Sequence, residues 1–248
     1  MGLLKVVLVP TLLCAALSCA QTVQADEAAA GWTGAGELGL ALTRGNSETE
    51  SLNAKLSLVW EDARWKHELG AAALRQKGES ALTDDLELTA NRYELSGSSA
   101  RKFGERSYFI GALRYENDDF APFSYQAIAS VGVGTYLIKE SATEWLIEGG
   151  PGYRRFRDTL SRETDGEVVL RARTAFKHAF NEQTSIEDTL LVEAGSDNTF
   201  VQNDLGVSVK MSTALALKAG LQFRHNSDVA PGVKKTDSLF TTNLVYGF

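Results

Sequence analysis

The chain has little cysteine: Cys14 and Cys19 are its only two, and both lie within the first 25 residues. In that segment Lys5 is the only charge, an apolar stretch follows it, and the small residue Ala25 closes it. A basic start, a short apolar middle and a small-residue exit are typical of a secretory signal peptide. We predict a signal peptide over 1–25, in preference to a membrane anchor or a lipidated Cys19. The mature chain would then lack disulfides and cysteine nucleophiles.

Three other features are scarce. Beyond the first segment no apolar run reaches the roughly 18 residues that a membrane helix needs, and the mean hydropathy is −0.16. There is no basic excess, because 25 Lys and Arg face 32 Asp and Glu for a net charge of −7. Such a chain has no basic stripe to neutralise nucleic-acid phosphates. Only four prolines and an even spread of 23% charged residues argue against disorder. A transmembrane β-barrel stays compatible with this composition, since only alternate residues meet lipid.

Apolar and polar residues alternate along nearly all of the remaining chain, which is the pattern of strands with two different faces. In one example Leu56 and Leu58 share a face, while Lys55 and Ser57 share the other. Most of the alternating segments have 11–15 residues, which exceeds the usual soluble strand and suffices to cross a membrane. The pattern predicts twelve strands, over 32–44, 49–60, 65–77, 84–97, 107–117, 124–138, 144–157, 167–180, 185–195, 200–211, 214–226 and 235–248.

We therefore predict an all-β fold: one closed antiparallel transmembrane barrel of about 12 strands, occupying residues 26–248. Short and long connections alternate, as periplasmic turns and outer loops do in outer-membrane barrels. An aromatic belt is expected at the periplasmic strand ends, where amphipathic rings prefer the interface. The last strand alternates and ends in an aromatic residue, a signal that the outer-membrane assembly machinery would read. The predicted belt residues are Trp32, Trp60, Trp65, Trp145, Tyr246 and Phe248.

The opposite face of the strands carries the ionised side chains, which we place in the lumen. About nine acids and ten bases fall there, and this near balance favours cross-strand pairing over selection for ions of one sign. Twelve strands lie between the filled eight-stranded barrels and the open channels of 16–18 strands, so a narrow pore and a filled barrel both stay open. The predicted lumen-lining residues are Glu37, Lys55, Arg114, Glu148, Arg154, Arg171, Arg173, Lys218, Arg224 and Asp237.

Some residues interrupt the alternation. Arg92 and Glu94 fall on the outward face of the fourth segment, which predicts a β-bulge that flips the register there. Pro151 lies within a strand without a ladder donor, which also predicts a bulge. Asp188 falls on the lipid face, so it should lie at the periplasmic rim. The acidic run 116–119 matches no calcium loop and is expected to be a solvated loop.

Several short motifs occur in order along the chain: Gly36-Glu37-Leu38-Gly39, then residues 43–49 (TRGNSET), 148–154 (EGGPGYR), 235–238 (KTDS) and 244–248 (LVYGF). With them the sequence resembles the salt-induced outer membrane protein family over nearly the whole mature chain. The resemblance implies a Gram-negative outer-membrane β-barrel of unknown molecular activity, with no catalytic or ligand residues to carry over. The family's name further implies a link to salt stress.

The residues themselves indicate no catalytic, cofactor-binding or metal site, and we expect no enzyme. The string 34–39 matches GxGxxG, but no helix follows to cradle a phosphate. His67 and His178 fall on the apolar face, where a base or ligand would serve poorly. His225 with Ser124 or Ser227 is the one candidate for a lipid-modifying enzyme.

We expect either a structural envelope protein or a narrow channel for small solutes or ions, located in the outer membrane. Its expected partners are outer-membrane lipids, lipopolysaccharide and the assembly machinery, with no nucleic acid and no cofactor. A lipid-modifying enzyme and a soluble secreted ligand-binding barrel are the alternatives.

Overall fold

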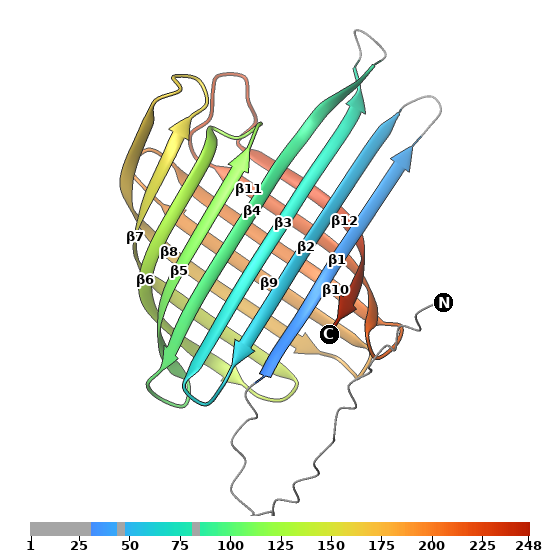
Figure 1. Ribbon diagram of the computed structural model, residues 1–248, viewed down its shortest axis with the longest axis vertical. Coiled ribbons are helices and arrows are strands. Elements are labelled where there is room, and N and C mark those ends of the chain that lie inside the picture. The colour runs from blue at the N-terminus through green and yellow to red at the C-terminus, as the bar shows by residue number, and fades with distance from the viewer. Residues whose placement is uncertain (1–30, 44–47, 81–84) are drawn as a thin grey trace, which may run out of the picture.

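Twelve antiparallel strands close into a barrel in the computed structural model, which describes residues 31–43, 48–80 and 85–248 (Figure 1). Residues 1–25, assigned above to a signal peptide, lie outside this described part. The strands are β1 (Gly31–Thr43), β2 (Thr49–Glu61), β3 (Trp65–Glu79), β4 (Leu86–Lys102), β5 (Ser107–Asp118), β6 (Phe123–Lys139), β7 (Thr143–Asp158), β8 (Thr164–Ala179), β9 (Thr184–Ala194), β10 (Thr199–Lys210), β11 (Leu215–Asn226) and β12 (Thr236–Gly247).

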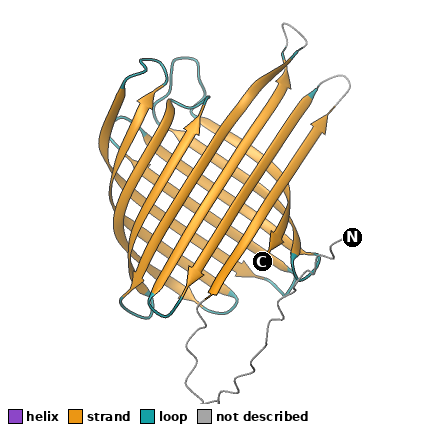
Figure 2. Ribbon diagram, viewed as in Figure 1, coloured by secondary structure: helices purple, strands orange, loops and turns teal. Residues whose placement is uncertain are grey.

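Each strand pairs with its neighbours in sequence, and β1 pairs with β12 to close the ring. Figure 2 shows the strands steeply inclined to the long direction of the barrel, as closure of a sheet requires. Among the described residues, no helix is long and apolar enough to cross a membrane. The predicted all-β barrel of twelve strands is therefore confirmed.

Most strand boundaries agree with the alternation to within two residues, and the largest difference is at the end of β4. The pattern places that end at residue 97, whereas the strand continues to Lys102. Residues 96–100 read SGSSA, so the two faces carry side chains of nearly equal size and polarity. The sequence of such a stretch shows no alternation between apolar and polar residues. The backbone nevertheless continues to pair with β3 and β5.

Apolar side chains cover the outside of the barrel and ionised ones fill the inside. Leu56, Leu170 and Leu217 are exposed, while Arg154 has no exposed surface. This is the inverse of a soluble protein, which buries its apolar groups and exposes its charges. The arrangement is stable only where hydrocarbon surrounds the wall. The molecule is a transmembrane barrel, not a soluble ligand-binding one.

The bulge expected in β4 exists and explains the anomaly near Arg92. The β3–β4 register shifts between Gln76 and Lys77, which pair with Ala90 and Leu88, so Thr89 is the extra residue. One extra residue exchanges the two faces of a strand. The Arg92 side chain consequently points into the lumen, where it bonds to another strand.

The other two anomalies have different outcomes. The expected bulge at Pro151 is wrong: the β6–β7 ladder is interrupted there, but the pairs Ser130–Gly152 and Val133–Gly149 on either side keep one register. The missing proline N–H removes a bond without adding a residue. Asp188 lies on the exterior, where its Oδ1 accepts a hydrogen bond of 2.7 Å from Asn203 Nδ2 on β10.

Candidate constriction of the barrel lumen

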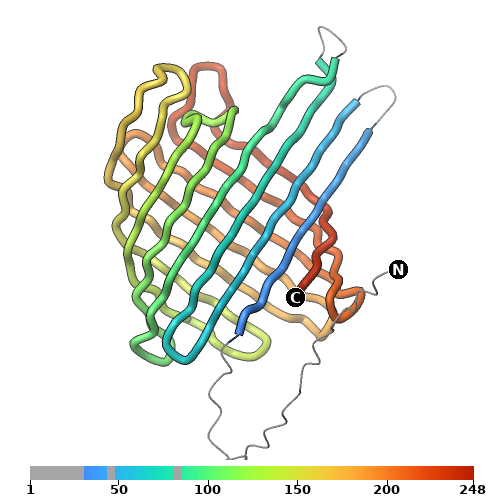
Figure 3. Tube along the Cα trace, viewed as in Figure 1, coloured from blue at the N-terminus to red at the C-terminus, as the bar shows by residue number. Residues whose placement is uncertain are grey.

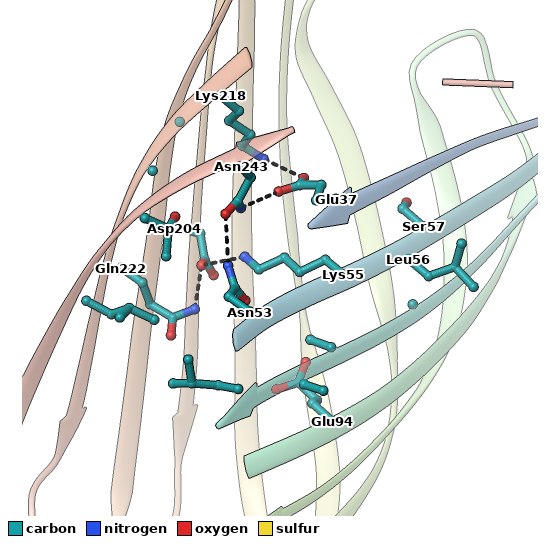
Figure 4. Close-up of a pocket in the computed structure, with 18 of the residues that line it drawn as sticks. Glu37, Asn53, Lys55, Leu56, Ser57, Glu94, Asp204, Lys218, Gln222 and Asn243 are labelled. Carbon is teal, nitrogen blue, oxygen red and sulfur yellow. Dashed lines mark hydrogen bonds and ion pairs between the residues drawn. The ribbon is translucent and has the colours of Figure 1, made fainter. Parts of the chain in front are cut away.

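Three cavities follow one another along the lumen. Cavity 1, of about 240 Å³, is drawn in Figure 4, and cavity 2, of about 210 Å³, adjoins it. The two share lining residues, among them Glu94 and Asp204. A vestibule of about 360 Å³ lies at the outer end, lined by strand ends and by residues 120–122. The material between the vestibule and the two inner cavities therefore decides whether the lumen is continuous.

Between the vestibule and cavity 2 lies a set of charged side chains which we call the cross-lumen layer, and cavity 1 meets the vestibule beside it at Leu74, Arg92, Gln222 and Leu239. Arg224 on β11 donates to Glu116 Oε2 at 2.6 Å and to Asp118 Oδ2 at 3.0 Å, both on β5. Strands β5 and β11 are six positions apart in a ring of twelve, so these bonds cross the full width of the barrel. The cross-lumen layer comprises Arg92, Arg114, Arg154, Arg224, Glu94, Glu116, Asp118, Glu167 and Glu193.

Arg114 is the second residue that spans the lumen. Its Nε donates to Glu193 Oε1 on β9 at 3.2 Å, and its Nη2 contacts the other oxygen of the same carboxylate. Its Nη1 donates to Glu116 Oε2 at 2.9 Å. The planar guanidinium fork suits such two-point binding of a carboxylate. Glu116 thus accepts from two arginines on different strands and joins them.

An aromatic ring and a buried arginine complete the layer. The guanidinium carbons of Arg114 and Arg224 lie 4.9 and 4.8 Å from the ring centroid of Phe200, at cation–π distance. Arg154 bonds Glu167 Oε1 at 3.1 Å and the carbonyl oxygens of Asn198 and Glu193 at 3.0 and 2.9 Å. Charges this deeply buried persist only when partners surround them. The layer is therefore a densely bonded network, in which the Nε atoms of Arg154 and Arg224 are the buried donors left without a partner among the described residues.

The walls of cavity 1 carry looser pairs (Figure 4). Lys55 Nζ on β2 lies 3.4 Å from Asp204 on β10, with both side chains about one-third exposed. Lys218 on β11 donates to Glu37 on β1 at 2.7 Å and also contacts Glu187 on β9. Four carboxylates and three cations line this cavity, so the two signs nearly balance: Glu37, Glu94, Glu187 and Asp204 against Lys55, Arg92 and Lys218.

Toward the periplasmic turns cavity 2 is followed by a space of only about 20 Å³, which is lined by apolar side chains together with Lys66 and Glu68. Glu148 accepts from Arg171 and Arg173 at 3.3 Å each and from the Tyr108 hydroxyl at 2.9 Å. Below it lies a buried apolar cluster formed by Ala100, Tyr108, Ile110, Tyr136 and Leu146. On the side of β4–β8, the lumen therefore has a charged closure at the outer end and an apolar one at the inner end.

The sequence-derived lumen residues gather in these places. Glu37, Lys55 and Lys218 line cavity 1; Arg114, Glu148, Arg171 and Arg173 line cavity 2; Arg224 and Asp237 line the vestibule. Asp237 is exposed at the outer end, and Arg154 lies within the cross-lumen layer. The alternation of the sequence does not predict the layer itself.

Glu116 is an example from this layer. It falls both in the predicted strand 107–117 and in the predicted loop 116–119, and the loop assignment is wrong, because the residue is 2% exposed and bonded to two arginines. The parity of β5 contained the signal, since Glu116 follows Arg114 by two residues and shares its face. Nothing local in the sequence shows that Arg224, more than a hundred residues later, is its partner.

Aromatic rings lie beside the short turns at one end of the barrel. Trp32 is opposite Trp60 in the β1–β2 register, and the ring of His67 stacks on Trp60 and Trp65 at 5.3 and 5.8 Å. The other predicted belt residues also make ring contacts. Trp145 meets Phe176 edge-on at 6.5 Å, and the rings of Tyr246 and Phe248 stack at 6.1 Å.

The histidines make structural contacts. His178 shares a hydrogen bond of 2.8 Å with Thr143, and His225 shares one of 2.9 Å with Thr236. The hydroxyls considered as partners for His225 bond elsewhere: Ser124 to the carbonyl of Arg157, and Ser227 to Asn198. The serine–histidine pair that the enzyme alternative needs is therefore not assembled in this structure.

Comparison with protein families matches residues 36–248 to the family described as "Protein of unknown function, DUF481". Comparison with curated proteins gives no match. Among solved structures, an outer membrane channel from Pseudomonas putida F1 is similar, with a TM-score of 0.50 and 10% identity over 92% of this chain and 99% of that one. This likeness shows the fold alone.

Two further structures are similar at lower scores. The NanC porin gives a TM-score of 0.49 and 12% identity, over 88% of this chain and 98% of that one. The translocator domain of the autotransporter NalP from Neisseria meningitidis gives 0.46 and 11%, over 88% and 87%.

Proposed function

The chain belongs to the DUF481 family, and we propose that it is a narrow outer-membrane channel for small polar solutes or ions, closed in this conformation by the cross-lumen layer. The observation that carries the proposal is the position of that layer between two polar spaces. Cavity 2 lies on one side of it and the vestibule on the other, while cavity 1 meets the vestibule at Leu74, Arg92, Gln222 and Leu239. A barrel with a purely structural role has no need for polar space on both sides of such a layer.

The expected passage is small and weakly selective. The layer holds four arginines against five carboxylates, and the walls of cavity 1 pair Lys55 with Asp204 and Lys218 with Glu37. A lining in which the two signs nearly balance attracts neither anions nor cations strongly. We expect conduction when the Arg224–Glu116 and Arg114–Glu193 bonds give way, and occlusion when they hold.

The test is single-channel recording in planar bilayers with the double variant Arg114→Ala/Arg224→Ala. The wild type should give small, brief and weakly selective steps, and the variant larger and longer ones. Arg155→Ala/Arg157→Ala is the matched control, because both arginines are exposed residues of β7. Heat-modifiable gel migration shows which proteins are folded.

The outcomes separate the candidates. A folded double variant as silent as the wild type would overturn the channel and favour a structural envelope protein. Should the double variant fail to fold, Glu116→Gln keeps the volume of the side chain while weakening the clamp on Arg224. Increased conductance in that variant supports the proposal, and unchanged conductance contradicts it.

We further propose the partners that this location entails: outer-membrane lipids and lipopolysaccharide around the wall, and the assembly machinery at β12. In that strand Phe240, Leu244 and Tyr246 share the outward face. A contribution to salt or osmotic tolerance also stays a prediction; growth of a deletion strain at high salt, with and without the Glu116→Gln gene, tests it.

A further inference from the structure

The β1–β12 seam, where the barrel closes, is paired over only part of its length. The register runs from Ala35 opposite Gly247 to Leu38 opposite Leu244, four pairs, with one further reciprocal pair of bonds between Gly34 and Phe248. On its other edge β1 pairs with β2 along all thirteen residues. Figures 1 and 3 show β1 and β12 diverging away from the C-terminal end of β12.

The divergent part leaves backbone groups facing an opening. Gly34 bonds Phe248 across the seam, and N–H and C=O groups alternate between the two edges of a strand. Leu40 and Leu42 therefore direct theirs toward β12, beyond the last pair in the register. Open sheet edges do not persist in hydrocarbon, and are tolerated only where protein or a water-filled cavity serves them.

A cavity does lie behind this opening. Cavity 1 is lined by Glu37 of β1 and by Leu239, Thr241 and Asn243 of β12, and the vestibule is lined by Leu239 as well. On the membrane side, Leu40, Leu42 and Phe240 are all strongly exposed apolar residues. The divergent part of the seam thus lies between a polar cavity inside the wall and an apolar surface outside it.

Side chains hold the seam together where backbone pairing ends. Asn243 follows the last pair, opposite Gly39; its Nδ2 donates to Glu37 Oε2 at 3.1 Å, and its Oδ1 accepts from Asn53 Nδ2 at 3.3 Å. The amide lies in the space that a side chain on Gly39 would take. Asn243 therefore ties β12 to β1 and β2 from the lumen side, at the base of the opening.

We propose that the divergent half of the β1–β12 seam is a lateral portal through which a zwitterionic phospholipid places its headgroup in cavity 1 while its acyl chains stay in the membrane. The apolar rim and the polar cavity match the two parts of such a molecule. Lys55 is paired with Asp204, and Lys218 with Glu37. A headgroup with both charges fits this paired lining better than a net anion does, because it adds no uncompensated charge.

The test uses liposomes of phosphatidylcholine containing a fraction of phosphatidylcholine with a photoreactive headgroup. After irradiation, mass spectrometry locates the adducts. We expect adducts on the inward residues Thr241, Asn243 and Lys55, in addition to those at the two outer rims of the barrel. Adducts at the rims alone would overturn the portal.

A locked variant makes the result specific to the seam. The described residues contain no cysteine, so Leu40→Cys/Thr242→Cys can be bridged across the divergent part by a short bis-methanethiosulfonate, which forms a reducible disulfide with each thiol and releases sulfinate. Leu217→Cys/Leu244→Cys is the matched control, because those residues are exposed and directly opposite on the paired β11–β12 ladder. Bridging the first pair should remove most inward adducts, and reduction should restore them; bridging the second should change nothing.

Inward adducts that persist in the bridged Leu40–Thr242 protein would mean entry from the mouth of the barrel, and would overturn lateral access. The same experiment with phosphatidylglycerol carrying the photoreactive group tests the headgroup class, because equal labelling by a net anion contradicts the zwitterion. The readout is independent of conduction. A barrel that never conducts can still show the adducts, and a conducting one can lack them.

Discussion

Two places in the barrel hold distant strands together with side chains, and they do so to different degrees. The cross-lumen layer joins β5 to β9 and β11 with buried, multiply bonded arginines, while the seam below the lateral opening is held by Asn243 and by the Lys218–Glu37 pair. In the layer most charges have at least two partners, and Arg154, Glu116 and Glu193 are almost completely buried. Beside the seam, pairs such as Lys55–Asp204 border an open cavity. The difference indicates that the cross-lumen layer is rigid and that the β1–β12 seam separates more easily.

The largest expected effect is on the free energy of unfolding, and it distinguishes the buried ion pairs of the cross-lumen layer from the partly exposed pairs of cavity 1. Arg154→Met leaves Glu167 and the carbonyl oxygens of Asn198 and Glu193 without their buried donor. Loss of one partner from a buried ion pair costs about 3–5 kcal/mol. Lys55→Met removes half of a pair that is about one-third exposed, which should cost about 0–1 kcal/mol. Urea unfolding followed by tryptophan fluorescence measures both, and equal losses would contradict the comparison.

The second effect concerns the two edges of one strand. Amide protons of Leu40 and Leu42 face the divergent seam, whereas those of Gly39 and Ala41 face β2 inside a continuous ladder. Paired amides exchange only through opening, and unpaired ones exchange freely. We expect exchange at least about a hundredfold faster at Leu40 and Leu42, measured by NMR in micelles. Equal protection on both edges would mean that the seam is closed.

Much of this fold could be predicted from the sequence because alternation is local. Strand number and lumen parity follow from side chains two residues apart, as Arg114 and Glu116 show. The bulge near Arg92 was visible as a change of parity. The pairing of Arg224 with Glu116 depends on which strands lie opposite in a closed ring. The end of the β1–β12 pairing at Leu38 and Leu244 depends on how the two strands diverge. Neither this end nor the Arg224–Glu116 pair can be predicted from a short window of sequence.

The third prediction compares two glycines of β1. A Cβ on Gly39 would meet the Asn243 amide and lie 3.0 Å from the carbonyl oxygen of Thr242, whereas a Cβ on Gly36 meets nothing within 4 Å. Overpacking costs about 1–3 kcal/mol, so Gly39→Ala should lower the free energy of unfolding and displace the Asn243 tie. Gly36→Ala should be neutral or raise stability by about 0.4–1 kcal/mol. Urea midpoints test this, and equal shifts would show that Asn243 does not hold the seam.

The smallest expected effect is the response to pH of the β2–β3 and β8–β9 turns, which lie outside the membrane-spanning part. In both turns one side-chain oxygen accepts two backbone N–H bonds. Asp62 Oδ1 accepts from the backbone N–H of Trp65 at 2.6 Å and of Arg64 at 2.7 Å, and Asn181 Oδ1 accepts likewise from Thr184 at 2.8 Å and Gln183 at 2.9 Å. These N–H bonds, that of Trp65 first, lower the pKa of Asp62.

A lowered pKa means that the contribution to stability is present above the unfolded value of about 3.9 and is lost as the pH falls through the folded value. Acid should therefore loosen the β2–β3 turn, next to the strand that carries the seam, and spare the β8–β9 turn, whose Asn181 does not titrate. NMR shifts of the Trp65 and Thr184 amides between pH 6 and pH 2 test the difference. The Asp62→Asn variant should make the two turns respond alike, and an unchanged pH response in that variant would assign the loosening to another carboxylate.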